Sequence, residues 1–207
     1  MTRKKRRKRR TVILFLIIFL ISCLALYFLI FKVAKVGSSH VIDQIKGYDY
    51  TLEKRDTQLM KTNFASLKEV LSADKVDYEK YAKLLSKLYI IDLYTIKNKN
   101  SKYDVGSMEY IYKDHRDNFK IKVQDTLYKF VEEKHGRKQK LPEVKSVDIS
   151  DLKETTYKYH DKEYDAYEMT ASWKYTKDLG YDDKAQITVV NIKDVLYIAS
   201  FTPEENE

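Results

Sequence analysis

The amino-acid sequence predicts an α+β domain that follows one membrane-spanning helix. A run of twenty uncharged residues, Val12 to Phe31, lies near the start of the chain. In the part that follows, apolar residues recur every three or four positions, which is the period of a helix. Beyond Pro142, apolar and polar residues alternate, which is the period of a strand. Helices followed by antiparallel strands are the order of an α+β fold, here about three helices packed on a sheet of about four strands.

The uncharged run over 12–31 predicts a transmembrane helix. At ~1.5 Å per residue it covers the ~30 Å hydrocarbon core of a bilayer and satisfies its own backbone hydrogen bonds. The positive-inside rule places the basic arm, residues 1–11, in the cytoplasm, so the chain is expected in the cell membrane as a single-pass protein with an extracytoplasmic domain. The cations of the arm also suit anionic lipid headgroups. They are Arg3, Lys4, Lys5, Arg6, Arg7, Lys8, Arg9 and Arg10.

Two other kinds of N-terminal segment share some of these features. A cleaved signal peptide has an apolar part of only ~7–15 residues, followed by a small-residue cleavage site. The segment Leu20-Ile21-Ser22-Cys23 looks like the lipobox of bacterial lipoproteins, in which the cysteine is lipidated. Eight more apolar residues follow Cys23, however, whereas a polar tether usually follows a lipidated cysteine. The membrane span is therefore favoured, with Cys23 as a small apolar residue inside it.

The net charge of +8 lies almost entirely in the basic arm. Of the 39 Lys and Arg residues, eight stand in the arm, which leaves 31 basic residues against 31 acidic ones elsewhere. A nearly neutral outer domain lacks the positive surface that binds phosphate backbones, so we expect no nucleic-acid partner for it. The single cysteine excludes an intrachain disulfide. An extracytoplasmic domain without disulfides fits a Gram-positive surface.

Three segments are expected after the span: a tether over 32–47, the α+β domain over 48–203 and an acidic tail over 204–207. The first helix of the domain starts near Thr57, and Asp56 is placed to cap its N-terminus. The apolar face of this helix is Met60, Phe64, Leu67 and Leu71.

Two further helices are predicted. One follows Asp77, and because residues 88–96 are apolar or aromatic almost all round, it should run through the centre of the core. The other starts near Asp114 and ends near His135 and Gly136, where the glycine suits a left-handed C-terminal cap. The apolar stripes are Tyr81, Leu84, Leu85, Leu88 and Ile91 in the first of these helices, and Phe119, Val123, Leu127, Phe130 and Val131 in the second.

Strands are predicted in the remainder of the chain, with turns at residues 160–162 and 178–183. The clearest strand alternates between an apolar face and a polar face over 167–175. The last two strands are joined by a tight link at Lys193 and Asp194, which predicts an antiparallel hairpin. The alternating segments are, in order, 147–149, 157–159, 167–175, 186–192 and 195–201.

This order of elements resembles the cystatin-like or NTF2-like superfold, in which a curved sheet wraps around helices. With a short basic arm and one span, the chain resembles the VirB8-like subunits of bacterial conjugation and type IV secretion machines. The stretches Gly47–Leu52 and Leu141–Val144 are similar to segments of small single-span membrane proteins of Firmicutes. The resemblance rests on element order over the whole chain, and it implies a role in an envelope assembly without supplying catalytic residues.

Few residues point to chemistry. The sequence contains no nucleotide-binding, hydrolase or metalloprotease motif, and its four histidines stand in separate polar segments, so we expect neither a metal nor a cofactor. Asp92 is the candidate catalytic residue, because burial in an apolar stretch would raise its pKa and suit it to act as a general base. The alternative is a structural Asp, hydrogen-bonded by a nearby Tyr or Lys.

The aromatic alternation over 167–175 also has two interpretations. Its side chains could line a ligand groove, or they could form one face of the core, which is the more common role of such a pattern. The candidate groove residues are Tyr167, Met169, Trp173 and Tyr175.

The expected function is a non-enzymatic, membrane-anchored domain that binds protein partners in a bacterial envelope complex, in secretion or conjugation, with homo-oligomers among the partners. The alternative is an enzyme or small-ligand binder with an NTF2-like pocket centred on Asp92. A deep cavity with convergent polar groups would favour the pocket. A filled core with an exposed apolar patch would favour partner binding.

Overall fold

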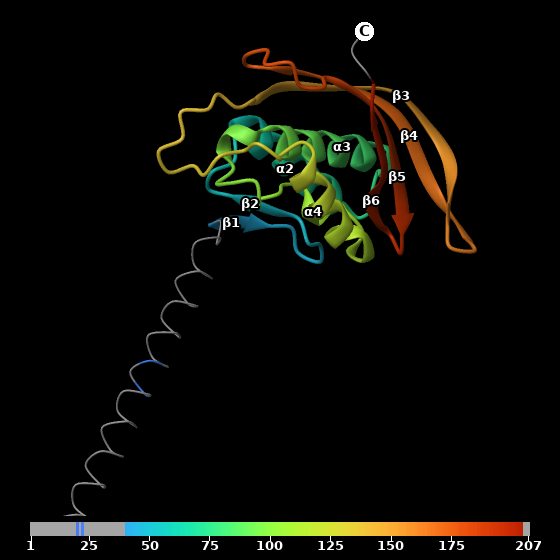
Figure 1. The fold of residues 1–207 in the computed structure, drawn as a ribbon. Coiled ribbons are helices and arrows are strands. Elements are labelled where there is room, and N and C mark those ends of the chain that lie inside the picture. Colours follow the sequence, from blue (N-terminus) through green and yellow to red (C-terminus); the bar gives the residue numbers. More distant parts are fainter. Residues whose placement is uncertain (1–19, 21, 23–39, 205–207) are drawn as a thin grey trace, which may run out of the picture. The chain divides into compact units, whose positions relative to one another are not determined.

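The computed structural model describes Leu20, Ser22 and residues 40–204. The predicted basic arm, the predicted span apart from those two residues, and tether residues 32–39 lie outside the described residues. Within the described part of the chain, no helix is long and apolar enough to cross a membrane. The chain divides into two units, residues 1–38 and 39–207, and the second, drawn in Figure 1, carries all the elements below.

Four antiparallel strands in the order β3-β4-β5-β6 form the main sheet. Consecutive strands are therefore neighbours, and the hairpin predicted for the last two is confirmed. Lys193 and Asp194 join them with φ of 55° and 64°. Positive φ at both positions is what a tight two-residue hairpin loop requires to match the twist of the strands. The strands are β3 Val144–Tyr159, β4 Lys162–Tyr175, β5 Lys184–Ile192 and β6 Val195–Pro203.

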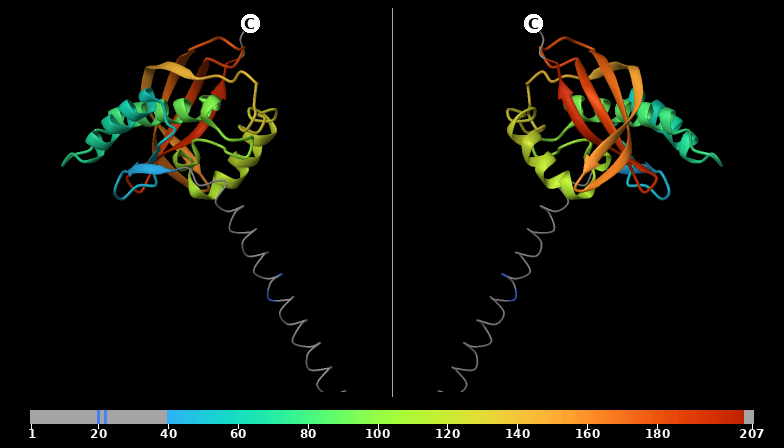
Figure 2. Two further views of the ribbon diagram at one scale, coloured as in Figure 1. Left: turned by 90° about the vertical axis from the view of Figure 1, so that its left-hand side faces the viewer. Right: turned by 90° about the vertical axis from the view of Figure 1, so that its right-hand side faces the viewer.

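The first strand of this sheet, β3, is continuous over 16 residues, where the sequence predicted two short segments. Its pairing with β4 shifts between Ser150 and Lys153, and Asp151 has a φ of 53°. A bulge of this kind inserts an extra residue and bends a strand without ending it, so the alternation in the sequence is broken although the strand continues. The sheet curves around the helices (Figures 1 and 2).

The helices lie on the concave side of the sheet (Figures 1 and 2). The central one, α3, is buried along most of its length, as predicted, and it packs against α2 and against β3. The α-helices are α2 Gln58–Leu71, α3 Tyr78–Tyr94 and α4 Arg116–Asp125, and short 3₁₀ turns are η1 Ile96–Asn98, η2 Met108–Tyr110 and η3 Lys113–His115.

The N-termini of α2 and α3 are each capped by a side-chain oxygen that accepts a hydrogen bond from a backbone N–H group of the first turn. Asp77, the residue before α3, accepts a hydrogen bond from the backbone N–H of Lys80 at 2.9 Å and so caps this helix. At α2 the prediction was wrong by one residue. Thr57 is the cap, whereas the carboxylate of Asp56 accepts from the backbone N–H of Glu53 at 2.7 Å.

The third helix, α4, ends ten residues before the predicted end near His135. Thr126, with φ of −119° and ψ of −93°, leaves the helical region, and its hydroxyl donates to the carbonyl oxygen of Lys122 at 2.7 Å. The chain then turns so that Tyr128 is fully buried while Phe130 is 77% exposed. The apolar stripe predicted for one long helix therefore belongs to a short helix followed by turns.

A small hairpin occupies part of the segment predicted as a tether. β1 (Val41–Gln44) pairs antiparallel with β2 (Thr51–Glu53), and the connection turns at Gly47, whose φ is 89°. The folded unit thus includes residues 41–47, before the predicted start at residue 48. Over the described residues, the α+β class with three α-helices and a four-stranded antiparallel sheet is confirmed.

Candidate functional site

A pocket of about 560 Å³ lies between α4, α3 and the concave face of the sheet. This volume is within the range of small-molecule sites, ~300–1,000 Å³. Its walls come from six elements, α3, η3, α4, β3, β5 and β6, and from the connections between them. The helices and the curved sheet together therefore form a cradle of the size of one small ligand.

One face of α4 and its flanking residues forms the first wall. The lining residues recur every three or four positions, which places them on one side of a helix. They form two rows, an apolar row toward the floor and a polar row beside it. The apolar row is Phe119, Val123 and Leu127, and the polar row is His115, Asn118, Lys122 and Thr126.

The opposite wall and the floor are mainly apolar. The ring of Phe201 in β6 packs against Tyr89 at 5.2 Å between ring centroids, and against Tyr94 at 6.1 Å. Ile198, which is 5% exposed, also contributes. Aromatic and aliphatic surface of this kind binds apolar groups by excluding water. The remaining apolar lining residues are Leu93, Ile111, Val190, Ile192, Ala199 and Pro203.

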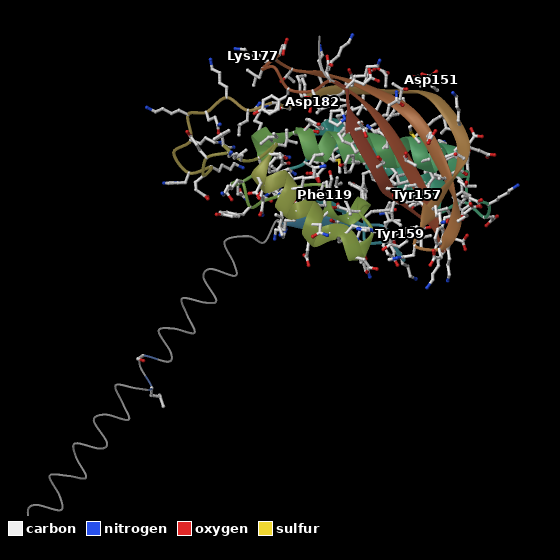
Figure 3. The ribbon with its side chains drawn as sticks, turned by 45° about the vertical axis from the view of Figure 1, so that its right-hand side comes forward. Phe119, Asp151, Tyr157, Tyr159, Lys177 and Asp182 are labelled. Carbon is white, nitrogen blue, oxygen red and sulfur yellow. The ribbon has the colours of Figure 1, made fainter. Side chains whose placement is uncertain are left out.

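Aromatic side chains surround one end of the pocket. Tyr159, near the end of β3, lies 6.0 Å from Tyr112 and 5.3 Å from His115 between ring centroids, in edge-to-face arrangements. Tyr157 lines the same end, and Figure 3 shows it beside Tyr159, with Phe119 on the neighbouring helix. These rings would enclose a flat or extended apolar group.

A hydrogen-bonded acid lies at the other end of the sheet. Asp182, in the connection between β4 and β5, accepts a hydrogen bond from the hydroxyl of Tyr94 at 3.1 Å. Burial and the nearby negative charge of Asp182 raise the pKa of Tyr94 above its ordinary value, so the phenol keeps its proton. Figure 3 shows Asp182 well away from Tyr157 and Tyr159.

Few side chains of the lining are hydrogen-bonded to one another. Tyr94 and Asp182 form the one hydrogen bond between two side chains of the described lining residues. Among the described residues, no group of three or more His, Cys, Asp or Glu is arranged to hold a metal ion. The polar row of α4 instead offers single groups that could orient a ligand.

The candidate catalytic residue, Asp92, does not line this pocket. Its carboxylate accepts hydrogen bonds from the ammonium group of Lys99 and from the backbone N–H of Ser107, and both of its oxygens are engaged. These contacts match the structural interpretation of Asp92. Asp92 therefore lies outside the pocket that α4 and β6 form, and the alternative of a pocket centred on Asp92 stays a prediction.

The candidate groove residues face the core and not the pocket. Met169 and Trp173 are 1% and 2% exposed, and the indole of Trp173 packs 4.9 Å from the ring of Tyr94. Tyr167 and Tyr175 are half-buried, and Tyr175 accepts a hydrogen bond from the Trp173 indole at 2.7 Å. The alternation therefore marks one face of the core.

Sequence reasoning missed the residues that do form the site. The sequence predicted Phe119, Val123 and Leu127 as a buried apolar stripe. The polar residues beside this stripe indicate a binding site only when the opposite wall, formed by α3 and the sheet, is known. Tyr157, Tyr159 and Asp182 come from other strands and loops. Comparisons with protein-family models, with curated proteins and with solved structures gave no match for this chain.

Proposed function

We propose that this domain is a non-enzymatic binding module that holds the apolar part of a small ligand in the pocket between α4 and β6. The single observation that carries this proposal is the 560 Å³ pocket with its aromatic and aliphatic lining. A closely packed domain leaves few voids larger than a water molecule, so a pocket of this size calls for an occupant.

The architecture supports the proposal. Helices on the concave face of a curved antiparallel sheet are the arrangement expected for a cystatin-like or NTF2-like fold, which leaves a cradle between the layers. The predicted membrane anchor would hold this cradle close to a bilayer, which raises its effective concentration for anything in that membrane. Fold alone does not assign function, so the proposal depends on the pocket.

Photo-labelling with a hydrocarbon probe tests the proposal. The full chain, in nanodiscs of zwitterionic lipid, is irradiated with a medium-chain diazirine probe, and the labelled peptides are identified by mass spectrometry. We expect label on peptides from α4 and β6. Labelling confined to the N-terminal apolar segment would show that the probe only partitions into lipid, and it would overturn the proposal.

A pair of variants on α4 gives the control. Asn118 lines the pocket and Lys120 does not, although both are exposed and lie two residues apart. We expect Asn118→Trp to fill the mouth of the pocket and to remove most of the label from β6, while Lys120→Trp leaves it unchanged. Equal labelling of the two variants would contradict binding in this pocket.

A second candidate function is protein–protein interaction in a bacterial envelope assembly. The observation that favours it is the exposure of Ile121 (57%) and Phe130 (77%), two large apolar side chains of α4 and the turn after it. Cross-linking in intact cells from a photoreactive residue at position 121 tests this role. Recovery of the same envelope proteins in repeated experiments supports it, and recovery of no protein contradicts it.

A further inference from the structure

The formal charges of the pocket lining are placed unevenly. Among the described lining residues, two carry a formal charge: the cation Lys122 and the anion Asp182. Asp182 accepts the hydrogen bond of the Tyr94 hydroxyl at one end of the sheet. Lys122 stands in the middle of the polar row on α4, one turn from Asn118 and one turn from Thr126. A ligand lying along α4 would therefore meet a cation at the rim.

The ammonium group of Lys122 is available to a ligand. The Lys122 residue is exposed, and the ion pairs among the described residues do not include it. By contrast, the neighbouring cation Arg116 is not among the lining residues, and its guanidinium group donates hydrogen bonds to the carboxylate of Asp49 and to the carbonyl oxygen of Ile111. Lys122 is thus placed to meet an anionic group that enters from solvent.

The apolar row lies directly beside this cation. Val123, next in sequence to Lys122, is 6% exposed, and Phe119 packs 6.1 Å from Tyr89 between ring centroids. A lysine can lay its methylene chain along such a surface while its ammonium group stays in water. One rim of the pocket therefore offers a charge, and the floor offers apolar surface without charge.

We propose that the ligand is a single-chain amphiphile with an anionic head, such as a fatty acid, whose chain lies in the pocket and whose head meets Lys122. This inference rests on the proposed binding function and narrows it to one chemical class. It follows from charge complementarity: a carboxylate or phosphate head would gain an ion pair at the rim, and an ammonium head would meet repulsion.

Three photoreactive probes of equal chain length, with a carboxylate, a hydroxyl or an ammonium head, test the inference on the full chain in zwitterionic nanodiscs. The measured quantity is the label on β6 peptides relative to the label on the N-terminal apolar segment, which corrects for partition into lipid. Because an exposed ion pair contributes modestly, we expect the carboxylate probe to exceed the hydroxyl probe roughly fivefold, with the ammonium probe lowest. Added salt should reduce the difference.

Two lysines of one helix supply the matched variants. Lys122→Gln should remove the preference for the carboxylate, and Lys122→Glu should reverse it in favour of the ammonium probe. Lys120→Gln, which removes the same charge from a position outside the lining, should leave the preference intact. If both Gln variants lose the carboxylate preference equally, the preference comes from the overall positive charge of the helix, and the role of Lys122 is overturned.

The outcomes separate the two proposals. If all three probes label the pocket equally in the wild-type chain, the anionic-head inference fails while binding of apolar ligands stands. If no probe labels α4 or β6, both proposals fail. A carboxylate preference that persists in Lys122→Glu would place the head elsewhere and would overturn the inference.

Discussion

The ammonium group of Lys99 contacts the carboxylate of Asp92 inside the domain, where the two side chains are only 1% and 12% exposed. Burial acts to lower the pKa of Lys99, but the attraction of Asp92 outweighs it and raises this pKa above its ordinary value. The lysine therefore stays charged in the core. The pair also fixes the loop that follows α3, because Ser107 donates its backbone N–H to the same carboxylate.

Removal of one partner should cost far more than removal of both. Lys99→Met leaves the Asp92 carboxylate buried without its cation, and we expect a loss of about 3–5 kcal/mol in the free energy of unfolding. The double variant Lys99→Met, Asp92→Leu replaces the pair with apolar groups and should recover much of that loss. Chemical denaturation of the full chain measures both. Equal stabilities for the single and double variants would contradict this coupling.

Gly106 closes the same loop over this ion pair. A Cβ atom at position 106 would lie 2.7 Å from the backbone oxygen of Asp92 and 2.8 Å from the Lys99 ammonium nitrogen. The Asp92 oxygen belongs to the backbone of α3, and the Lys99 ammonium group is held by the Asp92 carboxylate, so we expect Gly106→Ala to destabilise the domain by about 1–3 kcal/mol. Lys102→Ala, in the same loop, is the control and should change the midpoint of denaturation little. A fully stable Gly106→Ala variant would contradict the tight contact.

The core could be predicted from the sequence because its signals are local. The helical spacing of Met60, Phe64 and Leu67 and the alternation from Met169 to Trp173 each depend on residues a few positions apart, and all of these side chains are buried. The end of α4 could not be predicted, because the chain leaves the helix where the buried Tyr128 reaches Leu93 in α3, 35 residues earlier in the sequence. Tertiary contacts override local spacing at such points.

The pocket could not be predicted from the sequence, because it also depends on contacts between residues far apart in the chain. Its lining joins α4 to strands that follow it by about thirty to eighty residues, and no short pattern records which of them lie opposite. Asp92 illustrates the converse case. Its position in an apolar stretch correctly indicated burial, but only the fold shows that Lys99 and Ser107 satisfy it.

Glu109 should make stability depend on pH. Burial first, and the nearby negative charge of Asp92 second, raise the pKa of Glu109 from its ordinary value of 4.5 to about 8. Between these values the folded state holds a proton that the unfolded state has lost, so the folded state is favoured at low pH. This stabilisation is complete below 4.5 and is lost as the pH rises through about 8.

The size of this effect can be measured by urea denaturation of the full chain at pH values across that window. Because the Glu109 side chain is only partly buried, we expect a loss of about 2 kcal/mol toward the alkaline end. Glu109→Gln should remove most of this dependence, and Glu132→Gln, at an exposed position, should retain it. Asp56, whose pKa burial raises to about 6, would leave a smaller slope at lower pH in both variants. A stability that is independent of pH in the wild-type chain would show that Glu109 titrates normally.

Two fully buried tyrosines allow a matched test of what a hydroxyl contributes. The hydroxyl of Tyr128 donates to the carbonyl oxygen of Leu93 at 2.7 Å, in the last turn of α3, where backbone carbonyls lack helical partners. The hydroxyl of Tyr110 is equally buried and has no hydrogen-bond partner among the described residues.

Tyr128→Phe should therefore cost about 1–2 kcal/mol in the free energy of unfolding, because a buried acceptor loses its donor. Tyr110→Phe should be neutral or stabilising by up to about 1 kcal/mol, because a buried polar group without a partner is removed. Thermal unfolding of the two variants side by side measures the difference, and a larger loss for Tyr110→Phe than for Tyr128→Phe would mean that the Tyr110 hydroxyl is hydrogen-bonded in solution.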